Sequence, residues 1–246
     1  GGLHKGHISL LKKAKKYTKK IVVSIFINPK QFNSKADYFS YPKNIKNDLK
    51  ILKNFKTDYV YMPSNKDIYG FKSKKKPYLD KFEKKLCGKF RPGHFNGVIN
   101  VVNRLLQIIK PKFIFLGNKD FQQSVLIKKH IQKVNIKTFV VNCKTIRDRH
   151  GIAYSTRNKR LRINDIAKLR KIIKFLKKNK SFLRNNFFDK KSIRYLENQL
   201  KIFGATKIDY IEPLNVQTLK KPNKKNQKFN LFFAFYINKV RFIDNF

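Results

Sequence analysis

Two histidines near the start of the sequence have a spacing that suits phosphate chemistry. His4 and His7 lie three residues apart, just before a predicted helix, so both side chains can lie on one side of its N-terminus. Backbone N–H groups lack partners there and the helix dipole is positive, which favours a bound anion. Gly6 lets the backbone approach a ligand closely. Two imidazoles could then stabilise a phosphate that gains charge during transfer. Two exposed loop histidines are the alternative, and these residues alone do not decide between the two.

Two amide side chains follow the first predicted strand, in the segment SIFINPKQF. Asn28 and Gln31 come directly after the apolar run 21–27, and Pro29 ends that run. Ligands in open α/β sheets bind just beyond the carboxyl ends of strands. Amides at that place can bind hydroxyls or a carboxylate without adding charge. An ordinary polar turn is the alternative interpretation.

A third polar segment, LGNKDFQQ, follows another predicted strand. Gly117 permits a tight turn, Lys119 supplies a point charge suited to phosphate, and Asp120 can orient that lysine or a metal ion. Gln122 and Gln123 open the next helix on opposite sides, so only one of them is expected to face the site. The alternative is an ordinary loop with a helix cap.

Two further segments carry groups that bind anions. Ser155, Thr156 and Arg157 form a cluster that could clamp a polyphosphate through hydroxyl and bidentate guanidinium hydrogen bonds, unless the segment is a solvated linker. The sequence RPGHF at 91–95 is a turn that carries an arginine and a histidine into a helix. The polar segments after the predicted strands are expected to converge on one crevice.

Strand and helix signals alternate over the first part of the sequence. Continuous apolar strands separated by helices indicate a parallel sheet covered by helices on both faces, which is a Rossmann-like α/β architecture. The strands are predicted at 21–27, 58–62, 112–116 and 137–142, and the helices at 10–20, 44–55, 98–109 and 121–134.

The pattern changes near residue 147. Helices are predicted first and strands afterwards, which indicates a smaller, separate α+β domain with an antiparallel sheet. We therefore divide the sequence into domains 1–147 and 148–246. The predicted helices are 166–178 and 191–203, and the predicted strands are 207–211, 229–236 and 240–244.

The composition is strongly basic, with 59 Lys and Arg against 14 Asp and Glu and a formal net charge of +45. Such a charge suggests a nucleic-acid binder. We discount that interpretation, because the lysines are spread along the whole chain and Lys, Asn, Ile, Phe and Tyr all have AT-rich codons. Two cysteines are too few for a disulfide framework, which favours a reducing compartment. No apolar run has the roughly 18 residues of a membrane span.

Taken in order, the segments HKGH, SIFINPKQF, YPKN, RPGHFNGV, GNKDFQQ, STRN and RFIDN resemble the pantothenate synthetase family from residue 1 to residue 246. The resemblance implies a cytoplasmic homodimer that uses ATP and Mg²⁺ to join pantoate to β-alanine, with release of AMP and pyrophosphate. It implies a pantoyl-adenylate intermediate, protected from water by a closing second domain, and a place in coenzyme A biosynthesis. It implies neither a specific nucleic-acid partner nor a membrane.

The resemblance also assigns roles to residues. His4, His7 and Lys119 match the catalytic positions, and Asp48 or Asp120 could contact a metal ion held mainly by phosphates. The family's first strand has no counterpart in this sequence, so domain 1–147 is expected to lack one strand. The implied pantoate-binding residues are Asn28, Gln31 and Gln123, and the implied ATP-binding residues are Gly117, Asn118, Lys119, Asp120, Tyr154, Ser155, Thr156 and Arg157.

Two alternative functions remain at this point. One is a different nucleotidyltransferase with an HxGH element, which the two glutamine-bearing segments argue against. The other is a non-enzymatic polyanion-binding protein, which is supported only by the net charge.

Overall fold

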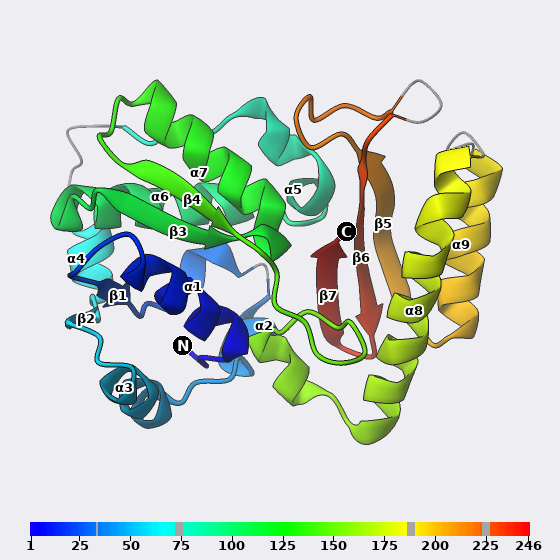
Figure 1. Ribbon diagram of the computed structural model, residues 1–246, viewed down its shortest axis with the longest axis horizontal. Helices are drawn as coiled ribbons and strands as arrows, with labels where there is room; N and C mark the ends of the chain where they lie inside the picture. Colours follow the sequence, from blue (N-terminus) through cyan, green and yellow to red (C-terminus); the bar gives the residue numbers. More distant parts are fainter. Residues whose placement is uncertain (33, 72–75, 186–189, 223–226) are drawn as a thin grey trace. The chain divides into compact units, whose positions relative to one another are not determined.

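The computed structural model describes residues 1–32, 34–71, 76–185, 190–222 and 227–246. The chain divides into two compact units, Gly1–Ile146 and Arg147–Phe246 (Figure 1). The first unit contains strands β1 (Val22–Ser24), β2 (Tyr59–Tyr61), β3 (Phe113–Gly117) and β4 (Phe139–Cys143). Its helices are α1 (Lys5–Lys15), α2 (Lys35–Phe39), α3 (Ile45–Asn54), α4 (Asn65–Tyr69), α5 (Leu86–Phe90), α6 (His94–Ile109) and α7 (Phe121–Lys133), with the short 3₁₀ helices η1 (Pro29–Gln31), η2 (Lys81–Lys84) and η3 (Asn118–Asp120).

The strands of the first unit form two parallel pairs. β1 pairs with β2 and β3 pairs with β4, and both pairs are parallel, which confirms the α/β class with parallel strands flanked by helices. Among the described residues, the two pairs are separate two-stranded sheets. β1 and β3 are not hydrogen-bonded to each other, because no described strand lies between them to complete the ladder.

Two helices begin earlier than the sequence pattern predicts. α1 begins at Lys5 instead of residue 10, because the His4 side chain accepts a backbone N–H and caps the helix. α6 begins at His94 instead of residue 98, because Gly93 has a φ of 76° and turns the chain directly into the helix. In both cases the polar first turn hides the helix from a search based on apolar spacing.

Apolar packing sets the position of α1. Leu11 and Ala14, three residues apart on one face of the helix, are buried in a cluster with Ile21, Ile25 and Leu52. The helix also contacts β3 and β4, beside which it lies in Figure 1. Packing of this hydrophobic face therefore fixes α1, and with it the position of the helix N-terminus.

The second unit is an α+β domain, as predicted. It contains η4 (Thr156–Arg160), α8 (Ile163–Asn185), α9 (Lys190–Ile202) and the strands β5 (Lys207–Leu214), β6 (Asn230–Ile237) and β7 (Val240–Asn245). The strands form an antiparallel sheet in the order β5-β6-β7, and α8 and α9 pack against it (Figure 1). The core includes Leu169, Ile172 and Leu176 from α8, Leu196 and Leu200 from α9, and Phe233 and Phe235 from β6.

None of the helices in the described ranges combines the length and the apolar character needed to cross a bilayer.

Truncation of a core leucine in the second unit should destabilise it strongly. Leu176 is fully buried between α8 and the sheet, so Leu176→Ala removes apolar contacts and leaves a cavity. We expect a loss of about 2–5 kcal/mol in the free energy of unfolding, measured by urea denaturation followed by circular dichroism. The exposed neighbour Lys174 provides the control, and equal losses in Leu176→Ala and Lys174→Ala would contradict this account of the core.

A buried histidine should make the first unit less stable in acid. His130 is 0% exposed, its Nδ1 accepts from the Tyr78 N–H, and its Nε2 lies 3.1 Å from the Asn103 side-chain oxygen. Burial lowers the pKa of His130. The unfolded chain therefore binds a proton first, and stability should fall as pH drops below about 6.5. Denaturation between pH 7.5 and 5.5 should show a smaller loss in His130→Asn than in the wild type, and an identical pH slope would contradict this.

Candidate active site

The two N-terminal histidines cap helix α1 reciprocally. His4 is the N-cap residue, and its Nδ1 accepts a hydrogen bond from the Gly6 N–H at 3.1 Å. The Nδ1 of His7, in the third helical position, accepts in turn from the His4 N–H at 3.3 Å. The two rings stack with their centroids 4.0 Å apart. This is a capping box built from two imidazoles.

The capping box determines where the imidazoles carry their protons. A backbone N–H can only donate, so Nδ1 of His4 and of His7 must be acceptors. A neutral imidazole that accepts through Nδ1 carries its hydrogen on Nε2. Each ring therefore keeps an Nε2–H donor on the side opposite the capping contact.

His7 is held in the neutral form. Burial lowers its pKa to about 4. Asp120 and Asp48 raise the pKa of His7 by smaller amounts, while Lys119 lowers it. A neutral imidazole can donate through Nε2 without losing its Nδ1 contact to the helix cap. Lys119 and Asp120 of η3 are thus near enough to His7 to influence its pKa.

Asp48 anchors the backbone that enters α1. It is fully buried in the first turn of α3, and its two carboxylate oxygens accept from the Gly2 N–H at 2.6 Å and the Leu3 N–H at 2.7 Å. Such charge-assisted bonds to backbone N–H groups are among the stronger hydrogen bonds in proteins. Asp48 thus holds the histidine turn in place, and both of its oxygens are engaged with the backbone.

The loop after β3 carries the predicted phosphate-binding lysine. Lys119 and Asp120 lie in η3 and form an ion pair, with Nζ and Oδ1 3.2 Å apart. Gln122, in the first turn of α7, is buried and donates to the carbonyls of Phe82 and Lys85 at 2.9 and 2.6 Å. Its side chain therefore supports η2. Of the two glutamines, Gln123 is left as the candidate ligand.

Asn28 is more tightly engaged than the sequence suggests. It is 1% exposed, and its Oδ1 accepts from the Lys30 N–H and from the Tyr69 hydroxyl. Its Nδ2 donates to the Gly97 carbonyl at 3.0 Å. Both acceptor positions of the side-chain oxygen are thus filled, and one N–H of the amide nitrogen remains beyond these three bonds. Asn28 organises the turn that carries Gln31, and a direct contact with pantoate stays a prediction.

The segment of Tyr154, Ser155, Thr156 and Arg157 lies in the second unit, at the start of η4. The Ser155 hydroxyl caps η4 by accepting from the Arg157 N–H at 3.4 Å. Thr156 is buried, whereas Tyr154 and Arg157 are partly exposed. Backbone capping orients this short turn, and a role of its side chains in ATP binding stays a prediction.

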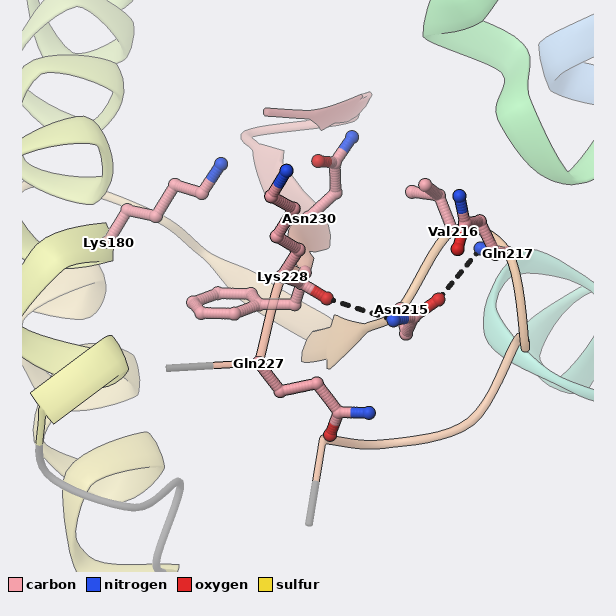
Figure 2. A pocket seen from close by; sticks show the side chains of 8 residues that line it. Lys180, Asn215, Val216, Gln217, Gln227, Lys228 and Asn230 are labelled. Carbon is pink, nitrogen blue, oxygen red and sulfur yellow. Dashed lines mark hydrogen bonds between the residues drawn. The ribbon is translucent and has the colours of Figure 1, made fainter. Parts of the chain in front are cut away.

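A surface hollow of about 420 Å³ in the second unit contains none of the predicted site residues. In Figure 2, Asn215 bridges its two sides by donating to the Lys228 carbonyl and accepting from the Gln217 N–H, at 3.1 and 2.8 Å. The Asn215 side chain is therefore engaged with the loop itself. The hollow is lined by Lys180, Asn215, Val216, Gln217, Gln227, Lys228, Phe229 and Asn230.

The described residues offer no protein-built metal centre, since no group of three or more His, Cys, Asp or Glu side chains comes together among them. The two candidates from the sequence are also committed elsewhere. Asp48 is occupied by backbone N–H groups, and Asp120 is paired with Lys119. Mg²⁺ prefers oxygen ligands and commonly binds through substrate phosphates with one or two carboxylates. These residues fit a magnesium ion that arrives on a nucleotide, with Asp120 as the more exposed carboxylate of the two.

Sequence reasoning missed several residues that shape the site. Tyr69 and Gly97 hold the Asn28 turn, and the capping by Nδ1 of both histidines was not anticipated. Gly97 carried a usable signal, because it lies in the RPGHFNGV segment and glycine often marks a close backbone approach. Tyr69 carried no such signal in the sequence, because its partner Asn28 lies 41 residues earlier in the chain.

A pair of imidazole donors at a helix N-terminus, next to a lysine loop on parallel strands, is typical of an α/β enzyme that binds an anion. The particular family follows from comparison with known proteins. The sequence model of the family described as pantoate-beta-alanine ligase matches residues 1–246, so the chain belongs to this family. The resemblance found in the sequence is confirmed, and neither alternative function is favoured.

Individual relatives agree with this assignment. The pantothenate synthetase of Francisella tularensis subsp. novicida (strain U112) is 41% identical over 248 residues, covering 100% of this chain and 86% of the relative. A crystal structure of the pantoate-beta-alanine ligase from Francisella tularensis, complexed with beta-gamma ATP and beta-alanine, has a TM-score of 0.83 at 41% identity, with the same coverage. A crystal structure of the Thermus thermophilus enzyme has a TM-score of 0.90 at 27% identity, covering 100% of this chain and 90% of that one.

The protonation of His7 can be measured directly. We expect the His7 imidazole to titrate near pH 4, because its burial disfavours the charged ring and protonation of Nδ1 would break the helix cap. The measurement is an NMR titration of the imidazole C–H signals, with His7→Ala used to assign the resonance. A midpoint between pH 6 and 7 would contradict the buried, neutral state.

Proposed function

We propose that this protein catalyses the ATP-dependent condensation of pantoate with β-alanine, and that the histidine turn at α1 is its adenylation site. The observation that carries the proposal is the reciprocal cap, which places the hydrogen of both imidazoles on Nε2 at a positive helix terminus. Membership of the pantoate-beta-alanine ligase family supports the choice of substrates. So do the beta-gamma ATP and the beta-alanine in the Francisella complex.

In the first step, a carboxylate oxygen of pantoate attacks the α-phosphorus of ATP. A new P–O bond forms, the bond to the departing pyrophosphate breaks, and pantoyl adenylate results. Negative charge builds on the α-phosphate and the leaving group, so fixed donors and cations lower the barrier. His4 and His7 would donate through Nε2, and the Lys119 ammonium would neutralise charge beside them.

The second unit would contribute polyphosphate contacts in this mechanism. Ser155 and Thr156 carry hydroxyls and Arg157 carries a guanidinium, the groups that bind phosphate oxygens well. Tyr154 is adjacent to them. Gly117 and Asn118, at the end of β3, would contact the nucleotide from the first unit. The role of residues 148–246 as a lid that protects the adenylate from water belongs to the same proposal.

Pantoate would be held by amide side chains, which bind its hydroxyls and carboxylate without repelling the negative phosphates. Gln31 lies at the end of η1, which follows β1, and Gln123 lies in the first turn of α7. Gln122 is excluded from this role, because both of its N–H contacts go to carbonyls of η2 and the residue after it. Asn28 would act mainly by organising the η1 turn.

In the second step, the amine of β-alanine attacks the carbonyl carbon of the adenylate. The C–N bond of pantothenate forms, the amine loses a proton, and AMP leaves. Asp120 would be a candidate carboxylate contact for Mg²⁺, which would supply additional charge neutralisation when it is bound together with ATP. We further propose that the enzyme is a cytoplasmic homodimer, as the family resemblance implies.

ATP–pyrophosphate exchange tests the proposal. Exchange should require pantoate and should not require β-alanine, because the adenylate forms before the amine reacts. His7→Ala should reduce exchange by about 10²-fold or more, as expected for loss of a positioned donor to developing charge. The exposed α1 residue Lys12 provides the control, and Lys12→Ala should retain exchange within about twofold of the wild type.

Two results would contradict the proposal. Exchange supported by an amino acid or by CTP, with pantoate inert, would indicate another HxGH nucleotidyltransferase. Tight RNA binding with a steep salt dependence and no effect of His4 or His7 substitution would indicate a polyanion-binding protein.

A further inference from the structure

The turn between α5 and α6 and the first residue of α6 contact the backbone of Gln31. Nδ1 of His94 lies 2.7 Å from the Gln31 carbonyl oxygen, and Nη2 of Arg91 donates to the same oxygen at 3.0 Å. Nη1 of Arg91 lies 3.1 Å from Nε2 of His94, which closes a triangle of three contacts. The mechanism above uses neither Arg91 nor His94, although both belong to the RPGHF segment that the sequence singles out.

The chemistry of these contacts assigns one protonation state to His94. The Gln31 carbonyl can only accept, so Nδ1 of His94 must donate. A guanidinium can only donate, so Nε2 of His94 must accept from Arg91. His94 is therefore a neutral imidazole with its hydrogen on Nδ1, the opposite tautomer to His4 and His7. Arg91 holds this ring in the orientation that directs Nδ1–H at Gln31.

The same helix holds the turn from a second side. A Cβ atom on Gly97 would lie 2.7 Å from the Lys30 carbonyl oxygen and 3.1 Å from the Gln31 nitrogen, so only glycine permits this approach. The Gly97 carbonyl accepts from the buried Asn28 side chain. The backbone of Gln31 thus meets α6 on both sides of its Cα atom, at Gly97 before it and at His94 after it, while the Gln31 carboxamide takes no part in these contacts.

We propose that Arg91 and His94 are positioning residues that fix the backbone of Gln31 and thereby aim its carboxamide at the hydroxy-acid substrate. This proposal rests on the proposed function, because it takes Gln31 as a pantoate ligand. A glutamine side chain has several rotatable bonds, and ordering them around a ligand costs conformational entropy. That cost is smaller when the backbone is already held in place, so the affinity for the ligand is higher. Arg91 and His94 act only through Gln31 and are not assigned contacts with ATP or with the reacting atoms.

The test is a steady-state comparison of substitutions, with pantoate and ATP varied separately. His94→Ala should raise the KM for pantoate about tenfold, which corresponds to one lost hydrogen bond of moderate strength. The KM for ATP and kcat should change by less than about threefold, because the α1 site is untouched. His94→Asn should recover most of the pantoate affinity, since its side-chain N–H lies at the same branch position as Nδ1.

A double-mutant cycle separates positioning from a general structural effect. Gln31→Ala removes the proposed ligand, so adding His94→Ala to it should raise the KM for pantoate by less than about twofold. Asn96, exposed on the same turn of α6, provides the control, and Asn96→Ala should leave both KM values unchanged. If His94→Ala fails to fold, Arg91→Lys gives a milder test, with an expected rise of about threefold in the KM for pantoate.

The outcomes distinguish this proposal from the proposed function. Pantoate-dependent exchange in the wild type, together with additive effects of Gln31→Ala and His94→Ala, would overturn the positioning role alone. Equal rises in the KM for ATP and for pantoate would overturn it as well, and so would a failure of His94→Asn to recover affinity. Absence of pantoate-dependent exchange in the wild type would overturn the proposed function and the positioning role together.

Discussion

The first backbone N–H groups of a helix have no acceptors within the helix. At the start of α1, the imidazoles of two histidines act as acceptors for two backbone N–H groups. Because Nδ1 of His4 and of His7 is used for this purpose, Nε2–H of each ring becomes the donor that the ring can offer to a ligand. A contact that stabilises the helix thus also sets the protonation state of the site. The fully buried Asp48 holds the preceding backbone, so the geometry depends on α3 as well as on α1.

Helix α6 serves the other half of the site in a similar way. His94 and Gly97 of α6 contact η1, and Arg91, which lies just before α6, contacts it as well. Asn28, which resembles a ligand in the sequence, is an internal bridge between these elements. Two backbone turns that carry candidate ligands are therefore each held by buried polar groups from distant helices, which favours a preorganised site.

The scarcity of acidic residues gives several of them structural importance. With 14 Asp and Glu in the chain, buried carboxylates occupy defined positions. Asp209 lies 2.8 Å from Nε of Arg241 between β5 and β7, and Asp244 pairs with Arg147 in the second unit. Asp48 binds backbone N–H groups through both of its oxygens. Removing one partner of such a buried contact leaves a charge or a donor without compensation, which is costly.

Local pattern alone determined the α/β class, the order of most helices and strands, and the family, because apolar periodicity and short polar segments are properties of neighbouring residues. It also indicated that only one of Gln122 and Gln123 faces the site. Only the tertiary structure decided that His4 caps α1, that Asn28 and Asp48 are buried connectors, and that the parallel strands form two pairs. The contact between His94 and Gln31 was also visible only in the tertiary structure. Most of these features depend on partners tens of residues away in the chain, whose proximity is set by packing and not by local spacing.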